Sequence, residues 1–483
     1  MRIHLRVFAL LICMAFAAAA QYTTASLGGT VVDTTGATLP EASVTVRNVD
    51  TGFAQTATTD ATGAFLFSRL PVGNYELRVE RTGFSTYVQT GITLTVNQMA
   101  NQVVTMQVGQ LAERITVEAN TELVVTRTGT LNQLVDQKRV VELPLNGRMA
   151  QTLVFLAAGT VDLGRNGCRI CGHGGVYPGE QTAGVNGAGM GQVNYQLDGA
   201  GHNDTYLNVN VPFPNPDSVQ EFNLQATNFT AEYGNAAGGI VNIVTRSGTN
   251  DIHGSAFEFL RNGKLNARNF FAPRQDTLKR NQFGASVGGP VVKDKLFYFG
   301  TYQGTRVRSE AAGRVAFVPT AAERTGDFSG LSRQLIDPVT RQPVPGNIIP
   351  PNRISAVSNY FLKYIPLPNR AGRELNFVGT NTIETENQFM VKMDYNLKQH
   401  QISGRYFFTD FDRPAVIPKE NILAASSAVN AVRVQNVSVN HTWTARPTLL
   451  VNSTFGLNRQ RGGSLSSSPF GYPDAGVKIS SAA

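Results

Sequence analysis

The sequence predicts a mainly β protein built from successive regions, and three observations support this. Only 16% of the residues are charged and 47 are glycine, a composition that suits strands and turns better than long helices. Residues 24–108 contain short alternating segments separated by turns, which predict an N-terminal β-sandwich. Residues 251–483 contain longer segments with one apolar and one polar face, which predict a second antiparallel structure.

The N-terminus has the pattern of a secretory signal peptide. Arg2 and Arg6 precede an apolar run over residues 7–16, and the small residues 18–20 form a cleavage site before Gln21. The run is too short to cross a membrane as a helix, so residues 1–20 are expected to direct export. The formal net charge is +8, and removing the two positive charges of the signal would leave +6.

Residues 24–108 alternate as sandwich strands do. Tyr75, Leu77 and Val79 alternate with polar neighbours, and turns at 33–36, 60–63 and 71–74 separate the runs. The segments GTVVD at 29–33, TDATGAF at 59–65 and LPVGNYEL at 70–77 resemble the carboxypeptidase regulatory-like family. That family shares its sandwich with carbohydrate-binding modules, so a sugar ligand is implied by fold analogy. Phe84 and Tyr87 could stack on a sugar, or pack in the sandwich or against a neighbouring domain.

A linker at residues 109–120 follows the sandwich. Five of its residues form a β-prone segment: Glu113, Arg114, Ile115, Thr116 and Val117. The segment resembles a TonB box, the short strand that an energy-transducing partner adds to its own sheet edge. The alternative is that these residues form the last strand of the sandwich or the first strand of the next region.

Residues 121–250 mix short helices and strands. Asp136 is expected to cap a brief helix that stops before Leu143-Pro144, and Asn146 to cap a second helix over residues 148–158. The segments LPLNGR at 143–148, YQLDG at 195–199 and SVQEF at 218–222, together with the Gly-rich turn and strand at 231–250, resemble the plug domain of TonB-dependent outer-membrane receptors. We therefore assign residues 121–250 to a small α/β plug.

From residue 251 onward the strands have two faces. Phe389, Val391 and Met393 share one face, whereas Lys392 and Asp394 share the other, as in a transmembrane β-barrel. A proline-rich stretch between about residues 309 and 373 is expected to form a long extracellular loop. About eight to ten strands are too few to surround a plug, and the receptors of this family use 22. We expect an incomplete barrel, open and curved, from a C-terminally truncated fragment.

Three cysteines are present, and Cys13 would leave with the signal. Cys168 and Cys171 are expected to form a local disulfide or to remain as two thiols. Of further zinc ligands only His173 is near, and Gly172 stands where covalent haem attachment needs histidine. No metal and no cofactor are assigned.

The sequence predicts a receptor rather than an enzyme. The six histidines are scattered and form no catalytic arrangement, and the thinly spread basic residues do not indicate nucleic-acid binding. The resemblance implies an outer-membrane location with a periplasmic sandwich, contact with membrane lipid, and a TonB-type energy-transducing partner. It also implies import of a scarce small ligand, such as a saccharide or a siderophore, with a corrinoid and a peptide equally open. The alternatives are an adhesion or envelope-organising protein, and a carbohydrate-binding surface protein without transport.

Overall fold

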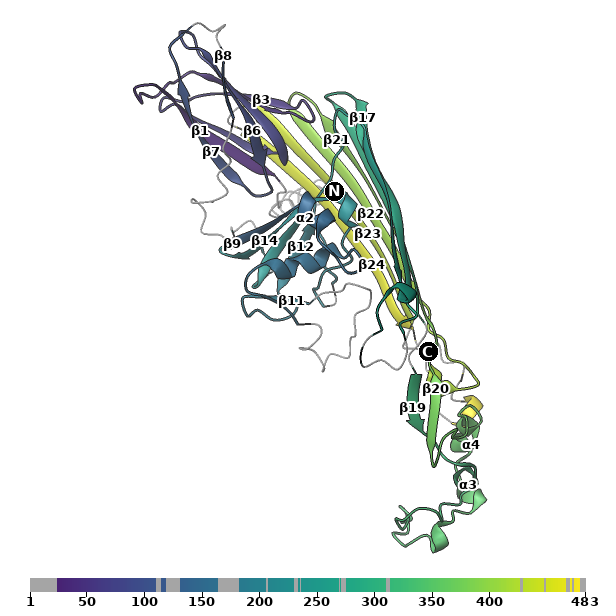
Figure 1. Cartoon of the computed structure of the whole chain (residues 1–483). Helices are drawn as coiled ribbons and strands as arrows, with labels where there is room; N and C mark the ends of the chain where they lie inside the picture. Colours follow the sequence, from purple (N-terminus) through teal and green to yellow (C-terminus); the bar gives the residue numbers. More distant parts are fainter. Residues whose placement is uncertain are drawn as a thin grey trace, which may run out of the picture.

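A computed structural model describes most of the chain after residue 23. The described residues are 24–109, 114–118, 131–163, 182–205, 207–229, 233–234, 236–268, 270, 275–309, 313–425, 429–446, 449–465, 470 and 473–477. The expected signal peptide lies outside them. Figure 1 shows the sandwich at one end of a long curved sheet, with a small α/β region on the concave side of that sheet.

The N-terminal region is a β-sandwich, as predicted. One sheet has the order β4-β1-β7 and the other has the order β3-β2-β5-β6-β8. The strands are β1 (Ala25–Asp33), β2 (Ser43–Asn48), β3 (Ala54–Thr58), β4 (Ala64–Leu70), β5 (Gly73–Glu80), β6 (Thr86–Leu94), β7 (Met99–Met106) and β8 (Arg114–Glu118). Tyr75, Leu77 and Val79 are fully buried in the core between the sheets. Tyr87 belongs to that core and Phe84 packs against it, which favours the packing role over sugar stacking.

Truncation of a core leucine should show how much the sandwich depends on this packing. Leu77→Ala is expected to destabilise the protein by about 2–5 kcal/mol, because it removes a fully buried side chain and leaves a cavity. Leu66→Ala, on β4 of the other sheet and 62% exposed, should change stability by less than about 0.5 kcal/mol. Urea unfolding of both variants measures the difference. Equal losses would contradict the assigned core.

The second region, here called the plug, has a five-stranded sheet of order β13-β12-β15-β14-β9. Its elements are β9 (Leu131–Asp136), α2 (Gln137–Glu142), η1 (Ala150–Leu156), β10 (Thr160–Asp162), β11 (Ala183–Val185), β12 (Val193–Leu197), β13 (Ala200–Gly201), η2 (Pro216–Ser218), β14 (Val219–Thr227) and β15 (Gly239–Thr245). Every residue of β15 is buried, as expected for a Val- and Ile-rich strand at the centre of a sheet. The predicted strand of the 231–250 stretch is therefore the plug's inner strand.

The third region, here called the wall, is a seven-stranded antiparallel sheet of order β16-β17-β18-β21-β22-β23-β24. Its strands are β16 (His253–Asn262), β17 (Lys279–Val292), β18 (Leu296–Ser309), β21 (Thr382–Asn396), β22 (His400–Arg413), β23 (Val429–Arg446) and β24 (Leu449–Leu465); a short turn, η3 (Gly263–Leu265), follows β16. In the described residues β16 and β24 each pair on one side only, so the sheet is curved and open. No helix in the described part of the chain is long and apolar enough to cross a membrane.

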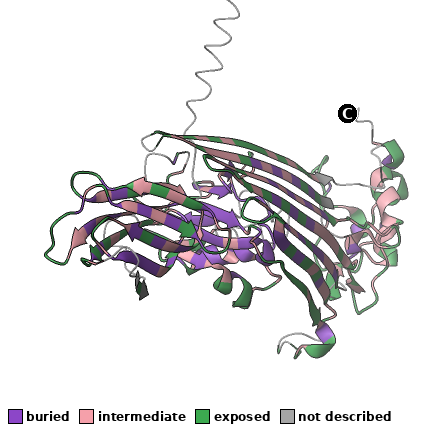
Figure 2. Cartoon of the chain, turned by 90° about the horizontal axis from the view of Figure 1, so that it is seen from above, coloured by how far each residue is buried: buried purple, intermediate pink, exposed green. Residues whose placement is uncertain are grey.

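The two faces of the wall differ as the sequence predicts. Phe389, Val391 and Met393 are 36–49% exposed on the convex face, whereas Lys392 on the other face is 6% exposed. Figure 2 shows the same alternation of exposed and covered residues along the strands. An apolar convex face is what a lipid-contacting barrel requires.

The proline-rich stretch is a folded insertion between β18 and β21 rather than a plain loop. It contains a two-stranded sheet, β19–β20, and short helical turns. These elements are β19 (Gly313–Phe317), α3 (Ala321–Arg324), η4 (Pro345–Asn347), η5 (Pro351–Arg353), α4 (Ala356–Leu362) and β20 (Glu374–Val378); the short turns η6 (Ile422–Ala424) and η7 (Pro473–Ala475) occur later in the chain. Figure 1 shows the insertion at the end of the wall opposite the sandwich.

The sandwich is docked on the plug at two places. The Val96 N–H donates to the Glu221 carboxylate on β14, and the Tyr233 hydroxyl donates to Asn97 Oδ1 at 3.0 Å. At the second place the Asn250 N–H donates to the Asp50 carbonyl at 2.9 Å. Val96 is 1% exposed and Glu221 is 5% exposed. The sandwich and the plug are therefore joined by polar contacts, and the one between Val96 and Glu221 is buried.

Candidate functional site

The plug packs on the concave face of the wall through a shared apolar core. Phe213, Phe222 and Leu197 of the plug belong to the same buried cluster as Phe299 and Phe407 of the wall. Burial of aromatic side chains contributes strongly to such contacts. The plug therefore covers apolar side chains on the inner face of the wall.

A buried ion cluster lies at the centre of this interface, where Asp198 of the plug meets two cations of the wall. Arg405 Nε on β22 is 3.1 Å from Asp198 Oδ2, and Lys392 Nζ on β21 is 3.8 Å from Asp198 Oδ1. The three side chains are 1–7% exposed. The same carboxylate accepts from the Thr245 N–H at 2.9 Å and from its hydroxyl at 2.7 Å.

The wall also binds the backbone next to Asp198. Arg405 donates from Nη2 to the Leu197 carbonyl at 2.7 Å, and Ser438 Oγ donates to the Asp198 carbonyl at 2.7 Å. Asp198 adopts φ +48°, a left-handed conformation that aspartate tolerates better than most residues. The tight turn thus directs both the carboxylate and the carbonyl of Asp198 at the wall.

The two cations of this cluster lower the pKa of Asp198. Burial alone would raise the pKa of Asp198, but the Lys392 ammonium and the Arg405 guanidinium outweigh it and hold the pKa of this carboxyl below its usual value. The carboxylate is ionised at neutral pH. The cluster then carries one negative and two positive charges, each with hydrogen-bonding partners.

His202, next to this cluster, is held neutral. Its Nε2 donates to the Pro212 carbonyl at 2.9 Å, and its ring lies 5.9 Å from the ring of Phe407 on the wall. Burial lowers the pKa of His202 to about 3. This histidine is therefore a fixed hydrogen-bonding group rather than an acid or a base.

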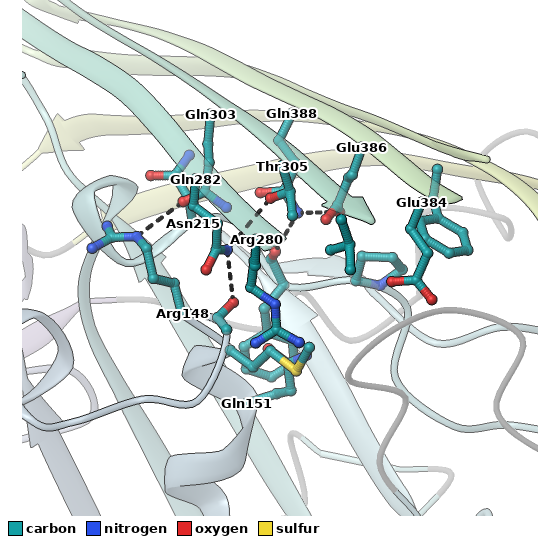
Figure 3. A pocket seen from close by; sticks show the side chains of 16 residues that line it. Arg148, Gln151, Asn215, Arg280, Gln282, Gln303, Thr305, Glu384, Glu386 and Gln388 are labelled. Carbon is teal, nitrogen blue, oxygen red and sulfur yellow. Dashed lines mark hydrogen bonds between the residues drawn. The ribbon is translucent and has the colours of Figure 1, made fainter. Parts of the chain in front are cut away.

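A polar cavity lies between the plug and the wall on the side nearer the 310–381 insertion (Figure 3). Arg148 of the plug forms an ion pair with Asp217 and donates from Nε to Gln303 Oε1 at 3.1 Å. Its guanidinium also lies 4.2 Å from the ring centroid of Phe257. Residues lining the cavity from the wall are Arg280, Gln282, Gln303, Thr305, Val307, Glu384, Glu386, Gln388 and Phe411. Amide and charged side chains of this kind can bind a polar ligand.

The residues predicted to bind a partner form an edge strand. Arg114, Ile115, Thr116 and Val117 lie in β8, which pairs in parallel with β6, and Thr116 is exposed. Glu113 lies outside the described residues. These residues form the last strand of the sandwich, which is the alternative given above. Their recognition by a partner stays a prediction. Cys168 and Cys171 also lie outside the described residues, so their pairing is untested.

One helix prediction is confirmed and one is wrong. Asp136 caps α2 by accepting from the Arg139 N–H at 2.8 Å, and the helix ends before Pro144. Asn146, however, caps no helix: the next turn is the 3₁₀ segment η1, which begins at Ala150. The Asn146 side chain instead accepts hydrogen bonds from Arg261 and Arg280 of the wall. Tertiary contacts here override a local capping preference.

Sequence reasoning missed the ion cluster. The sequence indicates Asp198 only as part of the YQLDG segment and Lys392 only as a polar position on its strand. Inward-facing charges on a barrel strand next to a plug are a usable signal, because a buried charge needs a partner. Among the described residues, no group of three or more histidine, cysteine, aspartate or glutamate side chains is placed to hold a metal ion.

Comparison with known protein families defines the class of the protein. Residues 244–481 match the outer membrane beta barrel domain, and residues 26–107 match the carboxypeptidase regulatory-like domain. The chain therefore carries an outer-membrane β-barrel domain and an N-terminal carboxypeptidase regulatory-like domain, and the barrel domain indicates an outer-membrane location.

Its similarity to one relative is more specific. The chain is homologous to the TonB-dependent transporter Oar of Myxococcus xanthus, with 29% identity over 288 residues. The aligned part covers 56% of this chain and 26% of that transporter, so the chain spans only about a quarter of this relative's length.

Solved receptors show a looser similarity. The ferric enterobactin receptor of Pseudomonas aeruginosa is 12% identical, with a TM-score of 0.41 over 70% of this chain and 42% of its own. The siderophore receptor PirA of Acinetobacter baumannii is 13% identical, with a TM-score of 0.36 over 65% of this chain and 37% of its own.

Proposed function

We propose that this protein is an outer-membrane receptor that binds a scarce ligand on its outer side and admits it when a TonB-type protein loosens the plug. The buried cluster of Asp198, Arg405 and Lys392 is the observation that carries this proposal. A purely structural interface is usually as stable with apolar side chains in place of a buried ion pair. Polar and charged groups, by contrast, can be rehydrated when the two surfaces separate.

The proposed partner would act on the side of the membrane opposite to ligand binding, where the sandwich lies. Strand β8 is the last strand of its sheet and pairs on one side only in the described residues. Its other edge can accept a strand from the partner by β-augmentation. The sandwich would then face the periplasm, and the insertion between β18 and β21 would face the outside.

No covalent chemistry is part of this proposal. Ligand binding selects the cargo, and the work of moving the plug comes from the partner complex. The polar cavity beside Arg148 and Gln303 favours a hydrophilic ligand, and a saccharide or a siderophore both fit that description.

Deletion of residues 113–117 tests the role of the partner. A strain carrying the deletion is expected to lose uptake, measured as growth on limiting iron or on single carbon sources, while the protein remains at the cell surface. The single change Ile115→Pro should act similarly, because proline lacks the N–H that a partner strand would bind. Ile115→Val retains β propensity and serves as the matched control.

Two outcomes would decide against transport. Uptake that survives the deletion would show that the segment recruits no partner. An adhesion or envelope-organising role would be favoured by two results together. The wild-type strain would show no uptake, and deletion of the gene would abolish cell–cell adhesion.

A further inference from the structure

Two arginines of the wall converge on a single neutral oxygen of the plug. Arg261 Nη1 donates to Asn146 Oδ1 at 3.2 Å, and Arg280 Nη1 donates to the same atom at 3.0 Å. The two arginines are directly opposite each other on β16 and β17. Like charges in such a cross-strand pair repel, and an amide oxygen offers only a dipole to oppose that repulsion.

The loop that carries Asn146 is held close to this pair. Gly147 adopts φ +76°, and a Cβ at this position would lie 3.2 Å from Arg280 Nη1. Gln282 Nε2 donates to the Gly147 carbonyl at 3.0 Å. The loop and the two guanidinium groups line one cavity together with the half-exposed Phe259.

Neither arginine has a carboxylate within 4.0 Å among the described residues. Of the nearby acids, Asp217 pairs with Arg148, and Glu384 lies 3.6 Å from Arg413 and attracts Arg280 only at longer range. Each guanidinium has five N–H donors, and one of them is used in the bond to Asn146. The remaining donors can form a bidentate contact with a carboxylate or a phosphate.

We propose that Arg261 and Arg280 form a recognition site for a carboxylate or phosphate group of a soluble ligand that enters from the outer side. Asn146 Oδ1 occupies the position that a ligand oxygen would take. Both arginines contact the plug, so they point into the lumen and away from membrane lipid. The inference rests on the proposed receptor function and specifies the charge of its ligand.

Purified full-length protein in detergent, titrated calorimetrically with citrate and with inorganic phosphate, tests this site. Binding by the Arg261→Ala/Arg280→Ala variant is expected to be weaker by at least about tenfold. The matched control is Lys279→Ala/Arg308→Ala. These residues are also directly opposite each other, on β17 and β18, and the alternation of the strand places them on the outer face.

Asn146→Asp is the second variant, because it places a carboxylate between the two arginines. It should raise the melting temperature in the absence of anions and weaken citrate binding by about tenfold or more. The proposal fails if the wild type binds neither anion, if the Lys279/Arg308 control loses as much affinity, or if Asn146→Asp changes neither quantity. These measurements need no uptake, so they can fail while transport stands. A deletion of residues 113–117 that leaves uptake intact would refute transport without touching this site.

Discussion

Replacing Asp198 by alanine is expected to destabilise the folded protein by about 3–5 kcal/mol, because it leaves Arg405 and Lys392 buried without a counter-charge. Both cations are under 10% exposed, so most of their surface is covered by protein. The loss should appear in urea unfolding and as faster proteolysis of the plug. Thr245 would also lose the acceptor of two hydrogen bonds.

An exposed ion pair on the same wall provides the control. Arg433 and Asp410 lie 2.9 Å apart, and their side chains are 52% and 39% exposed. Asp410→Ala should therefore change the unfolding free energy by less than about 1 kcal/mol. If Asp198→Ala and Asp410→Ala have equal effects, the buried cluster does not hold the plug to the wall.

Glu221→Gln is expected to remove a pH dependence of stability that the wild type shows between about pH 4.5 and pH 7. Burial raises the pKa of Glu221 from 4.5 to about 7. The hydrogen bond that Glu221 accepts from the Val96 N–H lowers this pKa, but by less. The folded state thus binds this proton more tightly than the unfolded state does. Stability is greatest below pH 4.5 and falls as the pH rises towards 7.

The full effect of ionising Glu221 is about 3 kcal/mol. Glu221→Gln should be more stable than the wild type by about this amount at pH 8 and equal to it near pH 4. Urea unfolding at several pH values, together with hydrogen exchange of the Val96 amide, measures this. Glu142→Gln, at an exposed position of α2, should leave the pH profile unchanged. Parallel profiles for wild type and Glu221→Gln would rule out this carboxyl as the cause.

Local patterns predicted the local structure well. Alternation along β21 correctly separated Phe389 and Val391 from Lys392, because a strand turns successive side chains to opposite faces. The Asp136 cap was also predicted, since its partner is only three residues away. The polar turns likewise predicted the sandwich.

Contacts between regions could not be predicted in the same way. Asp198 and Arg405 are 207 residues apart, and their pairing depends on how the plug sits on the wall. The Asn146 side chain was expected to cap a helix but binds two arginines from another region. The bond from Val96 to Glu221 likewise depends on two units that each fold around their own core.

The docking of the sandwich at two places has a geometric consequence. A single contact would act as a pivot, whereas contacts at Val96 and at Asp50 together define an axis and oppose rotation of the sandwich about either point. Rotation about the line that joins the two contacts is the turning motion that they leave open, so the edge of β8 has a restricted set of orientations relative to the plug. If a partner strand binds that edge as proposed, its pull would act on the plug within the same restricted set of directions.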